Sequence, residues 1–375
     1  RSALMFTFIV LGENMARRSS IYNTLSASAF LLLIYNPFWL WDVGFQLSYL
    51  AVLSIVIFMK PIYNLIYVKH KILDHVWKLL AVTLAAQILT TSITIYYFNQ
   101  FPLLFLFTNI VAVPVSSLIL LVEIALCATA TIPAIASQLG WVTYQLISGL
   151  NFYIESISRL PFALWSPLSI NFAQTILLYL VIAGFSLWLF TSSKRSLASA
   201  LACTVAFLSI RSYAIIQTAS QKKIIVYNAS GHHAVDFIQG NHFSFLSDSI
   251  LAQDNNLMSF HLRASRIRDR IFQSIPNLYI RRKNLLIFNG IRILLVDGQL
   301  SLPQQIQAQS IDLVIVLAKS SAPPERVIEM TGCKQVVIAS SYPSFLINIW
   351  QQACSSANVR MHINYANGAF AINIP

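Results

Sequence analysis

Long apolar runs alternate with short polar breaks over the first 216 residues. A helix that crosses a membrane needs about 20 mostly apolar residues. Runs that reach or approach this length are Ile21 to Tyr35, Val43 to Met59, Leu79 to Phe98, Phe101 to Ala130, Trp141 to Ile157, Ile170 to Phe190 and Leu197 to Ile216. Residues 5–11 look like the end of a truncated span. The pattern predicts a multi-pass α-helical membrane bundle with about seven spans.

The pattern changes near Gln221, where short β-branched runs alternate with helix-like stretches. The pair Asn289-Gly290 separates two such runs and predicts a hairpin, because both residues tolerate the positive φ of its turn. Further strands are expected at 224–227, 312–317, 335–339 and 359–363, and helices at 324–330 and 344–354. Residues 217–375 should therefore form a small soluble α/β domain.

Composition supports this division. The chain is 57% hydrophobic and 10% charged, against roughly 45–50% and 25% in soluble domains. Residues 1–216 carry 11 Lys/Arg and 5 Asp/Glu, whereas the shorter remainder carries 14 and 8. The chain opens at Arg1 inside an apolar stretch, which predicts that segment 1–216 is a membrane domain truncated at its N-terminus. Four scattered cysteines do not suggest a disulfide scaffold.

Basic residues between the apolar runs predict an orientation, because such residues favour the cytoplasmic side. They gather in two connections: Lys60, Lys69, Lys71 and Lys78 in the first, and Lys194 and Arg195 in the second. Four predicted crossings separate the two groups, so both lie on one side. One further crossing, by residues 197–216, places the soluble domain outside the cytoplasm.

Polar residues inside apolar runs are the first candidate functional groups. Asp42, Gln46 and Tyr49 lie four and three residues apart, which places them on one face of a helix that includes all three. Such groups are costly in lipid and are expected to face the bundle interior or an aqueous path. The alternative is that Asp42 lies at the interface and caps the next helix.

Asn109 and Glu123 are further polar residues in apolar runs, and Glu123 is the costlier in lipid. Either they border a hydrated path or they make buried structural hydrogen bonds. Prolines also border or interrupt the runs, and backbone groups that they free must be buried in protein or face water. Packed, kinked helices would explain the prolines equally well. These prolines are Pro102, Pro114, Pro133, Pro161 and Pro167.

The string that begins Asn36-Pro37 and continues from Asp42 through Gly44, Gln46, Ser48 and Tyr49 to Leu53 resembles the signature of the ComEC family. Arg17-Arg18 and residues 22–29 are similar to that family as well. The resemblance covers residues 1–216. It implies an inner-membrane channel that takes up single-stranded DNA in natural transformation, and it marks the residues of this string as motif candidates.

The same resemblance implies partners. These are single-stranded DNA, the lipid bilayer, and other competence proteins that act as DNA receptor, nuclease and cytoplasmic motor; a homo-oligomer is also compatible. The chain contains no phosphate-cradling G-x-x-x-x-G-K-[ST] loop, so driving energy is expected from a partner. Without the resemblance, a permease for a small solute or a membrane-anchored hydrolase would fit the same composition.

Members of that family often end in a metallo-β-lactamase-like domain, and the strand order after residue 291 resembles it. Such hydrolases hold two metals through an H-x-H-x-D-H cluster. Residues 318–324 stand at the matching place and offer no ligand. We therefore expect a degenerate, metal-free relative with no cofactor and no nuclease activity. His232, His233 and Asp236 form the nearest group of metal-ligand types, although a solvated turn explains them better.

Basic residues are densest between positions 263 and 283 of the soluble domain. Cations attract the phosphates of nucleic acids, and the overall charge of +12 is compatible with such a partner. Arg263, Arg266 and Arg270 would share a face if their segment is helical. A solvated face, or one that touches anionic lipid, is the alternative to a DNA track. The nucleic-acid-binding candidates are Arg263, Arg266, Arg270, Arg281, Arg282 and Lys283, and Arg268 belongs to the same basic cluster.

Overall fold

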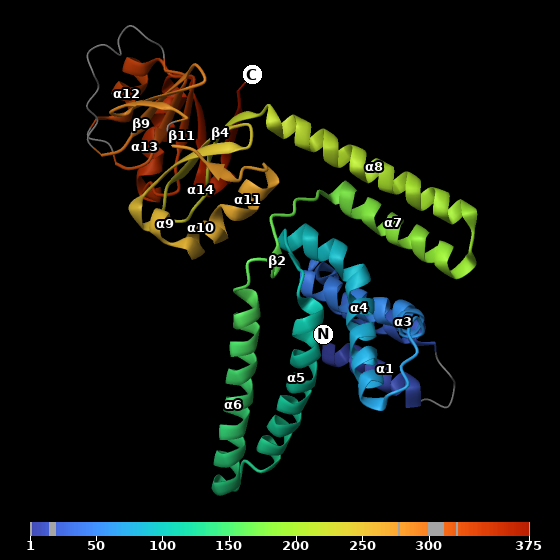
Figure 1. Cartoon of the computed structure of the whole chain (residues 1–375). Coiled ribbons are helices and arrows are strands. Elements are labelled where there is room, and N and C mark those ends of the chain that lie inside the picture. The colour runs from blue at the N-terminus through green and yellow to red at the C-terminus, as the bar shows by residue number, and fades with distance from the viewer. Residues whose placement is uncertain (1, 15–19, 277, 299–310, 320–321, 375) are drawn as a thin grey trace. The chain divides into compact units, whose positions relative to one another are not determined.

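The computed structural model describes residues 2–14, 20–276, 278–298, 311–319 and 322–374 (Figure 1). Arg17, Arg18, Ser320 and Ser321 therefore lie outside the described residues. The chain divides into two compact units, Arg1–Leu208 and Ser209–Pro375. The division falls within helix α8, close to the boundary between 216 and 217 expected from the sequence.

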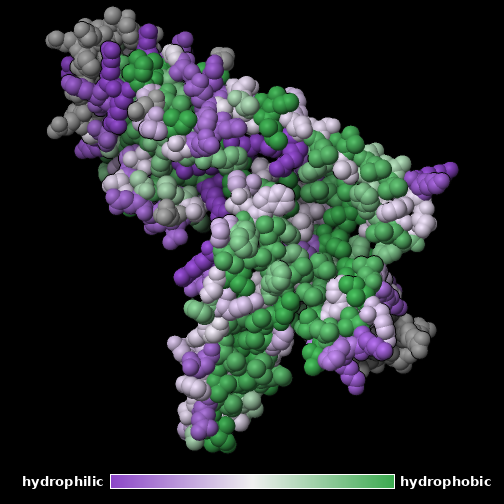
Figure 2. All heavy atoms as spheres, in the orientation of Figure 1, coloured by the Kyte–Doolittle hydropathy of each residue, from purple (hydrophilic) through white to green (hydrophobic). Residues whose placement is uncertain are grey.

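The first unit is helical. Its elements are α1 (Ser2–Asn14), α2 (Ile21–Tyr35), the 3-10 helix η1 (Pro37–Trp41), α3 (Val43–Tyr63), α4 (Lys71–Phe98), α5 (Phe105–Ala128), α6 (Pro133–Ser158), α7 (Phe172–Thr191) and α8 (Lys194–Ala219). Among the described residues, five helices are long and apolar enough to cross a membrane: α3, α4, α5, α7 and α8. Hydrophobic residues cover much of the visible helical surface (Figure 2). The protein is a multi-pass membrane protein.

The expectation of about seven spans needs correction. Helix α2 has 15 residues, which is short of the length that a hydrocarbon core requires. Helix α6 has 26 residues but is less apolar than the five that qualify. Most of its exposed polar residues lie on one side of the helix.

Small residues let the helices of this unit approach closely. Ser54 of α3 is fully buried, and its hydroxyl donates to the carbonyl of Ala85 in α4 and accepts from Leu89 N. Tyr179 of α7 donates to the carbonyl of Leu89 at 2.9 Å. Helices α3, α4 and α7 are thus joined through polar contacts in an otherwise apolar bundle.

Helices α5 and α6 form an antiparallel hairpin (Figure 1). The short strand β1 (Phe101–Pro102) precedes α5 and pairs with β2 (Leu164–Trp165), which follows α6. Tyr153 of α6 donates to a carbonyl of α5 at 2.9 Å. The paired strands bring the end of α6 back beside the start of α5.

The second unit is an α/β domain. Its strands are β3 (Lys222–Val226), β4 (Ala234–Gln239), β5 (His242–Ser247), β6 (Gln273–Ser274), β7 (Ile280–Arg282), β8 (Leu285–Phe288), β9 (Ile291–Val296), β10 (Leu313–Val316), β11 (Gln335–Ile338), β12 (Arg360–Ile363) and β13 (Phe370–Asn373). They form two sheets, ordered β12-β11-β10-β9-β8-β7 and β13-β3-β4-β5-β6. Strands β9 to β12 run parallel. The predicted hairpin is present, with φ of 46° at Asn289 and 86° at Gly290.

Three apolar clusters order this unit into four layers. One lies between the sheets and includes Phe237 and Phe288. A second packs α12 (Pro324–Thr331) and α13 (Ile347–Ser356) on the first sheet through Trp350. The third packs α9 (Ser249–Gln253), α10 (Asn255–His261) and α11 (Arg263–Arg268) on the second sheet through Leu251 and Leu262. The predicted fold class, a helical membrane bundle followed by a small α/β domain, is confirmed.

Candidate functional site

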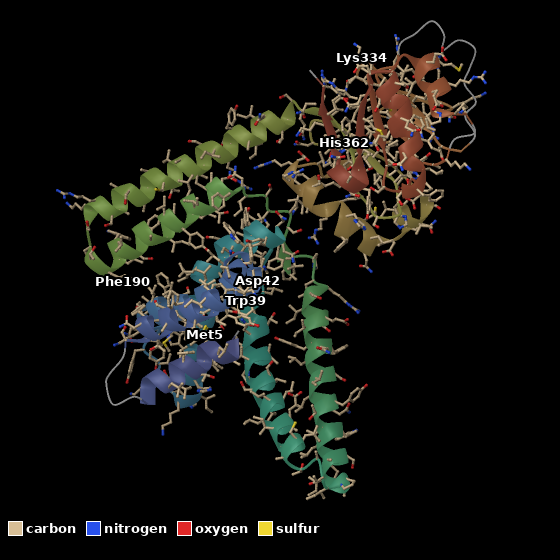
Figure 3. The ribbon with its side chains drawn as sticks, turned by 180° about the vertical axis from the view of Figure 1, so that it is seen from behind. Met5, Trp39, Asp42, Phe190, Lys334 and His362 are labelled. Carbon is tan, nitrogen blue, oxygen red and sulfur yellow. The ribbon has the colours of Figure 1, made fainter. Side chains whose placement is uncertain are left out.

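The motif string forms the turn that leads into α3. Asn36 Oδ1 accepts from Phe38 N at 3.0 Å at the start of η1. Asp42 Oδ1 accepts from Phe45 N at 3.0 Å, so Asp42 is the N-cap of α3. Gln46 Nε2 turns back and donates to the carbonyl of Leu40 at 2.8 Å. Figure 3 shows Asp42 beside Trp39, whose carbonyl accepts from Asp42 N at 3.0 Å.

This geometry corrects one hypothesis. Asp42 does not share a helical face with Gln46 and Tyr49, because α3 begins at Val43 and Asp42 precedes it with an extended backbone. The structure instead has the alternative arrangement, in which Asp42 caps the next helix, α3. Gly44 is exposed in the first turn of α3, and Ser48 is half-buried.

Tyr49 joins α3 to α2. Its hydroxyl lies 3.0 Å from Ser28 Oγ, which donates to the Leu25 carbonyl at 2.8 Å. Next to this contact, α2 and α3 border a groove of about 380 Å³. Its wall contains Tyr22, Leu25, Ser26, Ala29, Phe45, Gln46, Tyr49, Leu50 and Leu53. Gln46 and Tyr49 are thus brought together at a mostly apolar groove with a few polar groups.

The polar residues of α5 lie apart from that groove. Asn109 and Glu123 are half-buried, and neither side chain makes a hydrogen bond or ion pair within the part of the chain that the structure describes. They are 14 residues apart, close to four helical turns, so they face nearly the same direction. Ile119 is the one residue of α5 that is buried inside this chain.

Helix α6 carries the polar face that the sequence analysis did not single out. Its half-buried apolar residues and buried Thr143 lie toward α5. The opposite side, an arc of about 140° at 3.6 residues per turn, bears Gln138, Gln145, Ser148, Asn151 and Glu155. Exposed aromatic rings lie among them: Trp141, Tyr144 and Phe152. Counting charges does not find this face, because most of its polar residues are neutral.

The basic residues of the second unit do not form one surface. Arg266 reaches inward: its Nε lies 2.9 Å from Asp236 Oδ2 and its Nη2 lies 3.0 Å from Oδ1. Asp236 is fully buried and also accepts from the Tyr227 hydroxyl at 2.8 Å. Burial raises the pKa of Asp236, and the Arg266 guanidinium opposes this shift. Arg266 is therefore a core residue and is removed from the candidate nucleic-acid contacts.

The remaining basic candidates are placed differently. Helix α11 ends at Arg268, and Arg270 has a left-handed φ of 54°, so the predicted common face of 263, 266 and 270 is wrong. Arg263 and Arg268 are exposed. Three further cations, Arg281, Arg282 and Lys283, are exposed on β7 and in the turn after it, at the edge of the other sheet.

A cationic hollow of about 600 Å³ lies at the amino ends of strands β10 to β12. Lys334 and Arg360 line it, and Arg360 N donates to the carbonyl of Lys334 at 3.3 Å. The sequence analysis missed this pair because its members belong to neighbouring strands with a helix between them in the chain.

No group of three or more His, Cys, Asp or Glu side chains within the described ranges is placed to hold a metal. His232 Nδ1 instead lies 2.8 Å from Asp248 Oδ2, and the backbone N–H of His233 donates to Asp248 Oδ1 at 3.3 Å. The carboxylate of Asp236 accepts hydrogen bonds from the Arg266 guanidinium instead. The absence of nuclease activity stays a prediction.

Two family models match the chain. The model described as competence protein matches residues 1–192, and that described as ComEC C-terminal domain matches residues 224–374. The chain belongs to the ComEC family of competence proteins. A curated relative, ComE operon protein 3 of Bacillus subtilis (strain 168), is 25% identical over 217 residues. The match covers 56% of this chain and 26% of that protein, so the chain spans about a quarter of the relative's length.

A solved structure was also found, the metallo-β-lactamase fold protein YhfI from Bacillus subtilis. The match covers 41% of this ComEC family member and 100% of the YhfI chain, at 10% identity and a TM-score of 0.28. This likeness is too slight to support an inference about the second unit.

Proposed function

We propose that this chain forms part of an inner-membrane conduit through which a single strand of DNA enters the cell in natural transformation. Membership of the competence family supports the process. The observation that carries the conduit is the outer face of α6, which turns amides, hydroxyls and aromatic rings away from its neighbour α5.

The chemistry of that face fits a path for a strand of any sequence. Amide and hydroxyl groups are costly against acyl chains, so this face is expected to border water or protein. A path for single-stranded nucleic acid needs planar groups on which bases stack without sequence preference. Trp141, Tyr144 and Phe152 are 64%, 67% and 74% exposed and could provide them. The α2–α3 groove with Gln46 and Tyr49 is a second candidate segment of the path.

The proposed orientation places the α/β domain outside the cytoplasm. The basic connection between α3 and α4 and the basic start of α8 both favour the cytoplasmic side. Helices α4, α5, α6 and α7 separate them, and the return of α6 beside α5 makes the number of crossings even. Protease added to spheroplasts should cleave the domain; full protection would reject this orientation.

The function of the α6 face is tested by making it apolar. Gln145→Leu and Asn151→Leu should lower transformation at least about tenfold in cells that depend on this chain, with normal protein levels in the membrane. Ile147→Leu is the matched control, because Ile147 is apolar, 37% exposed and about 160° around the helix from Gln145. If α6 faced lipid instead, both leucine variants would fit lipid better, and normal uptake in them would reject the conduit.

A further inference from the structure

The residues that follow α11 lie next to the end of α8, the last membrane-spanning helix. Helix α8 ends at Ala219, and two residues later the side chain of Gln221 donates to the carbonyl of Asp269 at 2.7 Å. Lys223 Nζ forms an ion pair with Asp269 Oδ1 at 2.9 Å. The residue that directly follows α11 and Arg268 is therefore held within a few residues of the point where α8 ends.

A second link joins the same places. Gly240 N donates to the carbonyl of Gln221 at 2.8 Å, and Phe272 N donates to the carbonyl of the adjacent Asn241 at 3.1 Å. A Cβ on Gly240 would lie 2.9 Å from the carbonyl oxygen of Ala219, so the β4–β5 turn packs directly on the last residue of α8. The β4–β5 turn thus holds Phe272 close to the end of α8.

The segment also holds two cations close together. Burial and the neighbouring charge of Arg211 lower the pKa of Arg270. Arg211 belongs to the last turns of α8, so the charge of that helix acts on the segment that follows α11.

The surface of this segment combines apolar rings with cations. Phe260 of α10 is 82% exposed and Phe272 is 52% exposed. Arg263 is exposed, and the side chain of Arg268 is 78% exposed. We call the surface made by Phe260, Arg263, Arg268, Arg270 and Phe272 the α10–α11 rim. Figure 1 shows α9, α10 and α11 following one another along one edge of the unit.

The rim is held rigidly on the sheet beneath it. Leu262 and Ile271 are buried in the apolar cluster of that sheet, and Ile267 is buried as well. Arg266 adds the buried ion pair with Asp236, and its guanidinium lies 4.2 Å from the centre of the Phe243 ring. Because α11 is fixed from below and Asp269 is fixed to the chain just after α8, the rim cannot move away from the end of α8 without breaking these contacts.

We propose that the α10–α11 rim docks on the anionic headgroups of the bilayer that α8 crosses, with Phe260 and Phe272 inserted between headgroups and the arginines bound to lipid phosphates. Aromatic rings favour the interface between lipid and water. Arginines near an anionic leaflet are attracted to it over about one Debye length. This docking would hold that edge of the α/β domain on the bilayer, independently of whether DNA is present.

The test uses the whole chain in nanodiscs made of phosphatidylcholine with phosphatidylglycerol. The more accessible native thiols are removed with Cys127→Ala and Cys203→Ala, while Cys333 and Cys354 are buried. An environment-sensitive fluorophore is placed through Phe260→Cys or Phe272→Cys. Phe345→Cys is the matched control, because Phe345 is 79% exposed on the other side of the domain core, beside α13.

Fluorophores at 260 and 272 should show blue-shifted emission and strong quenching by lipids that carry a nitroxide near the headgroup, while the one at 345 should show neither. Arg263→Glu with Arg268→Glu should reduce the quenching at least about twofold, and discs without phosphatidylglycerol should do the same. Equal, water-like emission at all three positions would overturn the proposal. So would charge reversal that weakens binding of a fluorescent oligothymidylate and leaves lipid quenching unchanged, because the rim would then be a nucleic-acid track.

Discussion

Removal of the Arg266 side chain is expected to destabilise the α/β domain far more than its place in a basic segment suggests. Arg266→Met leaves Asp236 fully buried with the Tyr227 hydroxyl as its remaining side-chain donor. Asp236→Asn leaves the guanidinium, whose side chain is 17% exposed, without a carboxylate. Each change removes one partner from a pair that is joined by two hydrogen bonds.

The size of the effect follows from burial. Removing one member of a buried ion pair costs about 3–5 kcal/mol, because the other charge stays desolvated. A domain of this size loses about 2–4 °C of melting temperature per kcal/mol, so the expected loss is roughly 6–20 °C. Replacing the whole network with apolar residues, Tyr227→Phe with Asp236→Leu and Arg266→Met, should recover most of the loss, since no unpaired polar group remains.

The buried thiols of Cys333 and Cys354, which are 4% and 2% exposed, report unfolding. In the Cys127→Ala, Cys203→Ala chain, maleimide labelling during heating should begin at a lower temperature in Arg266→Met. Arg268→Met is the control on the same helix, and it should change stability by less than about 0.5 kcal/mol because its side chain is 78% exposed. Equal melting of the two variants would refute the assignment of Arg266 to the core.

Three further outcomes are expected. Gly184→Leu should separate α7 from α8 and lower the amount of folded protein, because even a Cβ there would lie 2.9 Å from a side-chain carbon of α8. Gly149→Leu is the control, because a Cβ on Gly149 would have nothing within 4 Å. Equal yields of the two variants in membrane extracts would contradict this packing. Tyr49→Phe should lose its contact with Ser28 and cost about 0.6 kcal/mol, measured by unfolding in mixed micelles; no change would mean that the contact is not formed. Burial lowers the pKa of His233 below its ordinary value of 6.5, so the unfolded domain binds more protons and stability should fall as pH drops below about 6.5. His233→Gln should flatten this part of the pH profile, and an unchanged profile would exclude His233 as its cause.

Local patterns predicted the elements whose cause is local. Apolar length identified α3, α4, α5, α7 and α8, and the Asn289-Gly290 pair identified its hairpin. The N-cap role of Asp42 could be predicted from the sequence, because Asp directly before an apolar helix is a common N-cap. The i, i+4 spacing of Asp42 and Gln46 instead predicted a shared helical face, because that prediction assumed that the helix already included Asp42.

Two features needed the folded chain. The burial of Arg266 depends on Asp236, which is 30 residues away on a strand that the sequence analysis did not assign. The polar face of α6 depends on which side of the helix α5 covers, and that follows from the pairing of β1 with β2. A search for charges finds Arg266 and Asp236 but not their pairing, and it misses the α6 face, which consists mainly of neutral amides, hydroxyls and aromatic rings.

The conduit is tested most directly by asking whether incoming DNA touches α6. A photo-crosslinking amino acid is placed at Gln145 or at Ile147 of the full-length protein in competent cells, and labelled transforming DNA is supplied before irradiation. Crosslinks between the strand and position 145, with none at 147, are the predicted result. Equal or absent crosslinking at both positions, in cells that still take up DNA, would contradict a path along this face.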